Sequence, residues 1–318
     1  MSESLRFHIV LPSRGEERGP GALPPFVTDL RGGAYGPYDQ LAQIARAAEI
    51  ATFHGVLAPF DAGGEESFVV ASGVLRHNRW LRAAAGFHPG IATPVYAAKV
   101  SASLQRFSSN RLDWRVEVDL DEATARAQGD FLTGADRYAR AAEFLTVAKG
   151  VWHEEGYTYE GRYFQVLAGG FAGPLAGGAF PRVHLSGTSP EALDLSARHA
   201  DVHVFGPADD LGALVPELRD RAAALGRAPA FGVALPVLAR EDEEEALAEA
   251  RRRTAAGDPP AGVVGSYAAA AEAIREYAAR GVTAFFLDAR PRIEEIYRLG
   301  EQLLPLLAGP RKETEHAD

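Results

Sequence analysis

A short loop rich in hydroxyl groups is the segment of this sequence whose residue types best fit a binding site. It reads Ser186-Gly187-Thr188-Ser189 and is followed by Pro190, which is typical of the first position of a helix. The free N–H groups at a helix start, together with nearby hydroxyls and the close approach that glycine permits, favour binding of a phosphate. The same residues also fit an ordinary capped helix, so spacing alone leaves both interpretations open.

Ionisable residues follow several predicted strands at the point where each strand ends. His88 follows the third strand and, because its ordinary pKa is near neutrality, it could act as an acid or base or make structural hydrogen bonds. Asp288 and Arg290 follow the last strand and are ionisable, which makes them candidates for catalysis, although such a position is suggestive and not specific. Tyr138, beside Arg137 at the start of a predicted helix, either brings a phenol to the same phosphate or packs on the surface.

The composition disfavours several classes of chemistry and of partner. The chain has no Cys, so thiolate nucleophiles, thiolate metal sites and disulfides are excluded. It has no HExxH pair and no GxSxG elbow, and we expect no metal. The net charge of −10 disfavours a nucleic-acid partner, and the absence of any apolar run of about 18 residues disfavours a membrane span. The start of the chain lacks an export-type apolar segment, so we expect a cytoplasmic protein.

Strands and helices alternate along the chain and position these residues. The predicted strands begin near residues 5, 55, 81, 112, 183, 202, 231 and 282, with amphipathic helices between them. This alternation predicts an α/β fold in which eight parallel strands close into a (β/α)8 barrel, with its active site at the carboxyl ends of the strands. A doubly wound open sheet is the competing interpretation, but residues 13–19 lack the G-x-G-x-x-G spacing that it would place after the first strand.

We expect one domain over residues 1–318, because barrels of this kind reach this length as single units. Residues 13–36 are rich in Gly and Pro and predict a lid-like loop. Residues 153–180 predict an insertion, in which residues 157–166 form a hairpin or an extended excursion that turns at Glu160-Gly161. Residues 308–318 predict a disordered tail.

A set of short segments, spread in order over most of the chain, carries a resemblance to a known family. The segments are residues 38–45 with 54–57, 93–94 with 97–99, 104–111, 137–138 with 142–144, 187–189, and 294–301. Together they resemble the bacterial luciferase-like superfamily of flavin-dependent monooxygenases. Within that superfamily they are most similar to the two-component alkanesulfonate monooxygenases.

The resemblance implies a barrel that binds reduced FMN, supplied by a separate NAD(P)H-dependent flavin reductase, and that uses dioxygen as co-substrate. It also implies a homodimer or homotetramer. By position, Tyr138 and residues 186–189 correspond to the family's phosphate-binding elements. Ala58, His88 and Arg115 fall at strand ends that face the flavin in that family.

Several pocket residues depart from the alkanesulfonate enzymes. Ala234 and Pro236 stand where those enzymes carry an Arg and a His, and Arg290 stands where they carry a Tyr. We therefore expect a different small organic substrate. In this interpretation Arg290 anchors an anionic or carbonyl group, and Asp288 or His88 handles protons.

Two other functions stay open on the sequence. The superfamily that the chain resembles includes deazaflavin-dependent oxidoreductases that transfer hydride, so the chain could be one of these. It could also be a catalytically silent barrel that stabilises a homologous partner, as the second subunit of bacterial luciferase does. The replaced pocket residues motivate this last interpretation.

Overall fold

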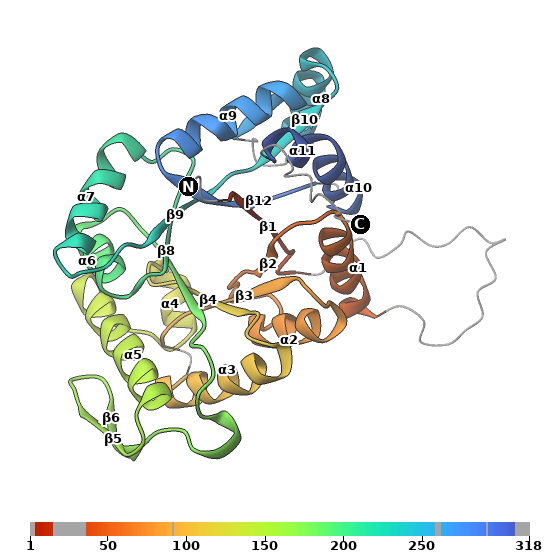
Figure 1. The fold of residues 1–318 in the computed structure, drawn as a ribbon. Helices are drawn as coiled ribbons and strands as arrows, with labels where there is room; N and C mark the ends of the chain where they lie inside the picture. Colours follow the sequence, from red (N-terminus) through yellow and green to blue (C-terminus); the bar gives the residue numbers. More distant parts are fainter. Residues whose placement is uncertain (1–3, 15–35, 91, 258–261, 291, 309–318) are drawn as a thin grey trace, which may run out of the picture.

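Eight parallel strands close into a barrel at the centre of the molecule, and helices surround it (Figure 1). The computed structural model describes residues 4–14, 36–90, 92–257, 262–290 and 292–308. Every predicted strand is present and begins within one residue of its predicted start, which confirms the (β/α)8 barrel. The barrel strands are β1 (Arg6–Val10), β2 (Gly55–Ala58), β3 (Arg82–Phe87), β4 (Leu112–Val116), β7 (Arg182–Ser186), β8 (Val202–Phe205), β9 (Ala230–Ala234) and β12 (Val282–Leu287).

Short polar or acidic residues cap many of the helices that cover the barrel, and the sequence therefore sets where these helices begin. Thr93 and Ser189 each precede a proline and accept a backbone N–H bond from the first turn, and Asp242 and Ser266 cap later helices in the same way. None of the helices in the described part of the chain is long and apolar enough to cross a membrane. The helices are α1 (Pro37–Ile50), α2 (Ser67–His77), α3 (Pro94–Ser108), α4 (Glu122–Ala127), α5 (Ala135–His153), α6 (Pro190–His199), α7 (Leu211–Ala223), α8 (Glu243–Ala255), α9 (Tyr267–Ala279), α10 (Arg292–Arg298) and α11 (Leu304–Leu307).

Alternation along the strands divides the buried side chains between two regions. Large apolar residues such as Phe87 and Trp114 pack between the strands and the surrounding helices. A smaller cluster fills the inside of the barrel, because successive strand residues point to opposite faces. Its buried members are Leu57, Ala84, Val202, Val204, Ala284 and Phe286.

Residues 153–180 leave the barrel as an excursion beside α5. Strands β5 (Tyr157–Glu160) and β6 (Gln165–Gly169) form an antiparallel hairpin, as predicted for this segment, and a 3-10 turn η1 (Gly173–Leu175) follows (Figure 1). Almost all of the predicted lid-like loop (residues 13–36) and tail (residues 308–318) lies outside the described residues.

The seventh barrel strand is shorter than predicted, because its continuation leaves the barrel. The sequence predicts one continuous strand over residues 231–238, yet β9 stops at Ala234. The next strand, β10 (Val237–Arg240), pairs in parallel with β11 (Val263–Ser266). The break falls at Pro236, which has no N–H to donate to a neighbouring strand, while its carbonyl accepts from Val263. Neither β11 nor the short helix α4 was predicted from the sequence.

Candidate active site

The loop after β7 forms a compact turn at the carboxyl end of the barrel, as the hydroxyl pattern predicts. Ser189 caps α6, with its Oγ accepting from the Ala192 N–H at 3.2 Å. Gly187 has φ +107°, a conformation that other residues rarely adopt. A Cβ at Gly187 would lie 2.8 Å from the Cβ of Ala192 and 3.2 Å from Asp119 Oδ2, so the turn also has no room for a side chain.

Three segments that are distant in sequence meet beside this turn. Tyr138, in the first turn of α5, donates its hydroxyl hydrogen to Asp119 Oδ2, just beyond β4. The Ser189 hydroxyl lies 3.4 Å from the same phenol oxygen. Burial, and then the hydrogen bond to Asp119, raise the pKa of Tyr138, so the phenol stays protonated and remains a donor. The structure thus brings Tyr138, Gly187 and Ser189 together as predicted and adds Asp119, which the prediction left out.

The residues of this turn fit a phosphate group, with one unfavourable member. Free N–H groups at the start of α6, the positive end of its dipole and the hydroxyls of Tyr138 and Ser189 all favour an anion. The Asp119 carboxylate lies against the same turn, and like charge disfavours a dianion there. Asp119 lies three residues beyond the end of β4, and this position near a strand end was the available sequence signal. Its hydrogen bond with Tyr138 depends on the packing of α5.

His88 is buried between Asp130 and Arg140 rather than facing the hydroxyl-rich turn. Its Nδ1 accepts from the Gly90 N–H at 3.1 Å, and its Nε2 lies 3.3 Å from Asp130 Oδ2. Arg140 makes a two-pronged ion pair with that carboxylate, at 2.8 and 2.9 Å. Burial, and then the nearby Arg140, lower the pKa of His88 to about 4, so the ring is neutral near pH 7.

The other predicted cofactor residues lie on neighbouring strands. Arg115, on β4, donates from Nε to Glu117 Oε1 at 2.8 Å and is mostly buried. Ala58, at the end of β2, is buried in the layer between strands and helices. Its carbonyl would lie 3.0 Å from a Cβ placed at Gly86, so β2 and β3 approach closely there.

The predicted catalytic pair after β12 forms a separate group. Asp288 Oδ2 accepts from Arg290 Nη2 at 3.0 Å, and Asp288 Oδ1 accepts from Arg292 Nη1 at 3.2 Å. Arg292 also donates to the Val10 carbonyl at 3.0 Å, which links this group to β1. In the strand order of the barrel, β12 lies opposite β4, so this charged group stands across the mouth from Asp119.

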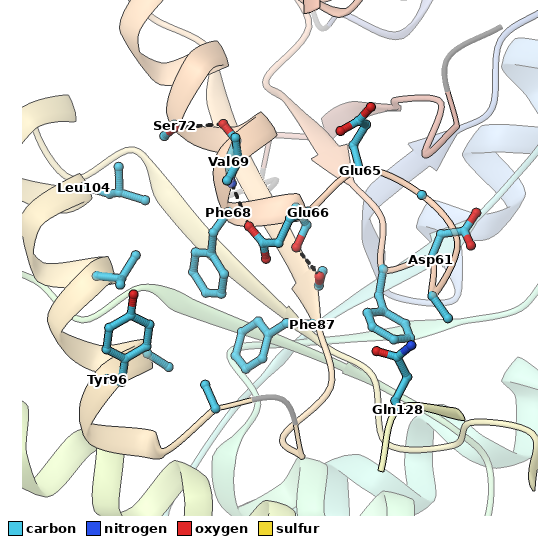
Figure 2. A pocket seen from close by; sticks show the side chains of 18 residues that line it. Asp61, Glu65, Glu66, Phe68, Val69, Ser72, Phe87, Tyr96, Leu104 and Gln128 are labelled. Carbon is cyan, nitrogen blue, oxygen red and sulfur yellow. Dashed lines mark hydrogen bonds between the residues drawn. The ribbon is translucent and has the colours of Figure 1, made fainter. Parts of the chain in front are cut away.

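A cavity of about 620 Å³ opens beside the barrel mouth between α2 and α3 (Figure 2). Aromatic side chains form its walls, among them Phe68 from α2, Phe87 from β3 and Tyr96 from α3. The ring of Phe60, which also lines the cavity, is 6.4 Å from the ring of His88. None of the predicted site residues lines the cavity, so this pocket was not predicted from the sequence.

An ion pair fixes the rim of the cavity. Asp61, on the loop after β2, accepts from Ser13 Oγ at 2.7 Å, from Arg14 Nε at 2.9 Å and from the Gly63 N–H at 2.9 Å. The hydrogen bonds from Arg14 and Ser13 hold the pKa of Asp61 below its ordinary range. The loops after β1 and β2 are therefore tied together beside the pocket.

Several solved structures share the fold at low sequence identity. A riboflavin lyase superimposes with a TM-score of 0.77 at 18% identity, covering 96% of this chain and 91% of that one. A coenzyme F420-dependent tetrahydromethanopterin reductase from Methanopyrus kandleri gives 0.75 at 15% identity, covering 96% and 100%. The oxygenating constituent of 3,6-diketocamphane monooxygenase from Pseudomonas putida, in complex with FMN, gives 0.73 at 15% identity, covering 97% and 100%.

The match of a family model extends over nearly the whole barrel. The model is that of the luciferase-like monooxygenases, and it matches residues 5–283, from the start of β1 into β12. The closed parallel barrel with its mouth at the strand ends is the fold of those structural neighbours. The chain therefore belongs to the luciferase-like monooxygenase family.

Proposed function

We propose that the protein is the oxygenase of a two-component system, which uses reduced FMN and dioxygen to oxidise a small organic substrate other than a simple alkanesulfonate. The observation that carries the proposal is the convergence of Tyr138, Gly187 and Ser189 at the start of α6. Hydroxyls, free backbone N–H groups and a glycine, which has no side chain to block a ligand from the backbone, meet at one helix start and suit the phosphate end of a flavin nucleotide.

The remaining residues of the mouth have roles that follow from their positions. Reduced FMN, when bound, supplies the electrons that activate dioxygen. His88, held neutral by burial and oriented by Gly90 and Asp130, positions an imidazole near the third strand end without adding charge. Arg290, held by Asp288, offers a guanidinium to an anionic or carbonyl group of the substrate.

The cavity between α2 and α3 supports an apolar substrate. Its walls carry the rings of Phe60, Phe68, Phe87 and Tyr96, which favour burial of an apolar or aromatic body (Figure 2). Such a substrate would exclude water from the neighbouring mouth, and oxygen chemistry on a reduced flavin needs that exclusion.

The proposal includes two kinds of partner. A separate NAD(P)H-dependent flavin reductase supplies the reduced FMN, which would place both proteins in the cytoplasm. A homodimer or homotetramer is supported by apolar side chains that project from α2 and α3, where Val69, Tyr96 and Phe107 are 68%, 62% and 75% exposed. Light scattering on the purified protein measures the oligomeric state directly.

An anaerobic titration tests the cofactor. Reduced FMN and reduced coenzyme F420 are added separately to the purified protein, and binding is followed by absorbance and fluorescence. We expect FMN to bind with a Kd of about 1 μM or tighter and to bind more tightly than F420. Admission of air should then give oxygen consumption that rises when an apolar substrate is added.

Two results would replace this proposal with one of its alternatives. Preferential binding of reduced F420 would identify a deazaflavin-dependent oxidoreductase, a class represented among the structural neighbours. Binding of neither cofactor, together with co-purification of a homologous barrel that does bind flavin, would identify a silent stabilising subunit.

A further inference from the structure

The opposite end of the barrel carries an unusual layer of side chains. Inside a (β/α)8 barrel, residues from alternate strands share a layer, and bulky branched apolar residues usually fill it. Arg6 on β1, Arg82 on β3 and Arg182 on β7 come from alternate strands at their amino ends. The fourth alternate strand contributes Ala230.

The strand register shows that these three side chains point into the barrel. Arg6 lies two residues before His8, whose ring stacks on the interior residue Phe286 at 4.7 Å. Arg82 lies two residues before the interior residue Ala84. Since alternate strand residues share a face, each arginine faces the same interior as its neighbour two positions on. Arg182 stands in the same relation to His184, whose ring lies 5.6 Å from that of Phe286.

One carboxylate neutralises one of the three guanidinium groups. Asp113, on β4, accepts from Arg82 Nη2 at 2.6 Å and from Arg82 Nε at 2.9 Å, and it is buried. Among the described residues, the side chains of Arg6 and Arg182 form no hydrogen bond or ion pair. The nearby Asp201 carboxylate is engaged by the Val183 N–H at 2.9 Å and by an arginine on the outside, Arg227, at 3.4 Å. The layer therefore has an excess of positive charge.

The surrounding groups do not remove this excess. Burial lowers the pKa of Arg182, and the proximity of Arg6 lowers it further. Burial, followed by Arg6 and Arg82, lowers the pKa of His54 to about 4, so this imidazole is neutral near pH 7. Above the layer, His8 and His184 are also neutral, because burial lowers their pKa values, and the Nδ1 atom of each is buried without a hydrogen-bond partner in the described residues.

We propose that the amino-terminal mouth of the barrel binds a small divalent oxyanion of the phosphate type between Arg6 and Arg182. Guanidinium groups donate paired N–H bonds that match the oxygens of such an anion. Arg82, fixed by Asp113, completes the positive field from a third strand. The site lies at the end of the barrel away from the flavin site that we propose and does not depend on it.

An anion held there binds only the folded barrel and therefore stabilises it. It also offsets the mutual repulsion of the three guanidinium groups. The occupant is identified by its chemistry alone, which is two negative charges on tetrahedral oxygens.

Thermal unfolding in inorganic phosphate tests the proposal. The Tm of the protein is measured in increasing phosphate, in sulfate, and in sodium chloride at matched ionic strength. We expect phosphate and sulfate to raise the Tm by about 2 °C or more above chloride. Arg6→Gln and Arg182→Gln should each lower the phosphate affinity about tenfold, which corresponds to the loss of one charged hydrogen-bonding partner.

Matched controls assign the effect to this end of the barrel. Arg251→Gln removes an exposed charge from α8 and should keep the whole phosphate effect. Tyr163→Phe, which removes a hydroxyl from the excursion beside α5, should keep it too. Without phosphate, the Arg182→Gln protein should be at least as stable as the parent, because an unpaired charge is removed; a merely structural arginine would give a less stable protein.

Two outcomes would overturn the proposal. The first is that phosphate stabilises the parent protein no more than chloride does. The second is that stabilisation by phosphate persists in both Arg6→Gln and Arg182→Gln, which would locate the anion elsewhere. Circular dichroism shows whether each variant is folded. If Arg182→Gln does not fold, persistence of the full phosphate stabilisation in Arg6→Gln overturns the proposal by itself.

Discussion

The two ends of the barrel differ in whether their charged and polar side chains have partners. At the carboxyl end, polar groups are paired: Tyr138 with Asp119, His88 with Asp130, and Arg290 with Asp288. At the amino end, Arg82 has Asp113 as its partner, whereas Arg6 and Arg182 have none among the described residues. At the carboxyl end, a ligand must therefore replace hydrogen bonds that already exist between side chains. At the amino end, an anion can bind Arg6 and Arg182 without breaking such bonds.

The turn at Gly187 should show the largest effect of any single substitution at the carboxyl end. Gly187→Ala forces an unfavourable backbone conformation and places a Cβ 2.8 Å from the Cβ of Ala192. We expect a loss of about 3 kcal/mol in stability and loss of measurable flavin binding. Gly226→Ala is the matched control, since Gly226 also has positive φ (+69°) but nothing within 4 Å of its Cβ position. It should lose about 1 kcal/mol and keep flavin binding, and equal behaviour of the two variants would contradict the role given to the turn.

Buried histidines should make the fold sensitive to acid. Burial and the nearby Arg140 lower the pKa of His88 from 6.5 to about 4. Between these two pH values His88 therefore binds a proton in the unfolded chain but not in the folded protein. Stability contributed by this group is therefore full above pH 6.5 and falls as the pH drops toward 4. Urea unfolding should show a loss of about 2 kcal/mol from His88 between pH 7 and pH 5.

A variant isolates that contribution. His88→Gln should reduce the difference in unfolding free energy between pH 7 and pH 5 by about 2 kcal/mol, whatever its stability at pH 7. Thr146→Ala, at an exposed position of α5, serves as control, because it removes no group that titrates between pH 5 and pH 7, and it should leave the difference unchanged. If His88→Gln and Thr146→Ala have the same pH dependence, the assignment of His88 as a neutral buried group is wrong.

Removal of the Tyr138 hydroxyl should have a smaller effect, which we expect in the affinity for reduced FMN. Tyr138→Phe removes a donor at the start of α6 without changing the packing of the ring, and we expect reduced FMN to bind about tenfold more weakly. Tyr163→Phe, in the excursion beside α5, is the control, because its hydroxyl donates to Asp136 at 3.1 Å away from the turn. Unchanged FMN affinity in Tyr138→Phe would remove the phenol from the proposed phosphate site.

Substitution of Asp119 should have the smallest effect on FMN affinity, and it should strengthen binding where substitution of Tyr138 weakens it. Asp119→Asn removes a negative charge beside the turn while keeping an acceptor for Tyr138. We expect FMN to bind about threefold more tightly, with riboflavin, which lacks the phosphate, unaffected. Fluorescence titration of both flavins measures the ratio, and equal changes for the two would show that Asp119 does not act on a phosphate.

The sequence predicts most of the barrel strands and the turn before α6, but not which strands and side chains pair with one another elsewhere. Strand starts and the capped start of α6 follow from local patterns, because alternation, Ser189 and Pro190 act within a few residues. The departure of β10 from the barrel was not predicted, since it depends on what the backbone beyond Pro236 pairs with.

The side-chain contacts between different strands and helices could not be predicted from the sequence either. The pairing of Asp119 with Tyr138 needs α5 packed on β4, and the arginine layer needs the register of alternate strands around a closed barrel. Both are long-range properties, and neither leaves a local pattern in the chain. The cavity between α2 and α3 is likewise formed by aromatic residues that also read as ordinary core.

The dissociation constant of reduced FMN, measured anaerobically in paired variants from the two ends, tests the central claim most directly. The double variant Tyr138→Phe with Ser189→Ala should weaken binding about thirtyfold or more, and Arg182→Gln should change it by less than about twofold. Normal affinity in the double variant together with a large loss in Arg182→Gln would show that the flavin does not bind at the carboxyl end of the barrel as proposed.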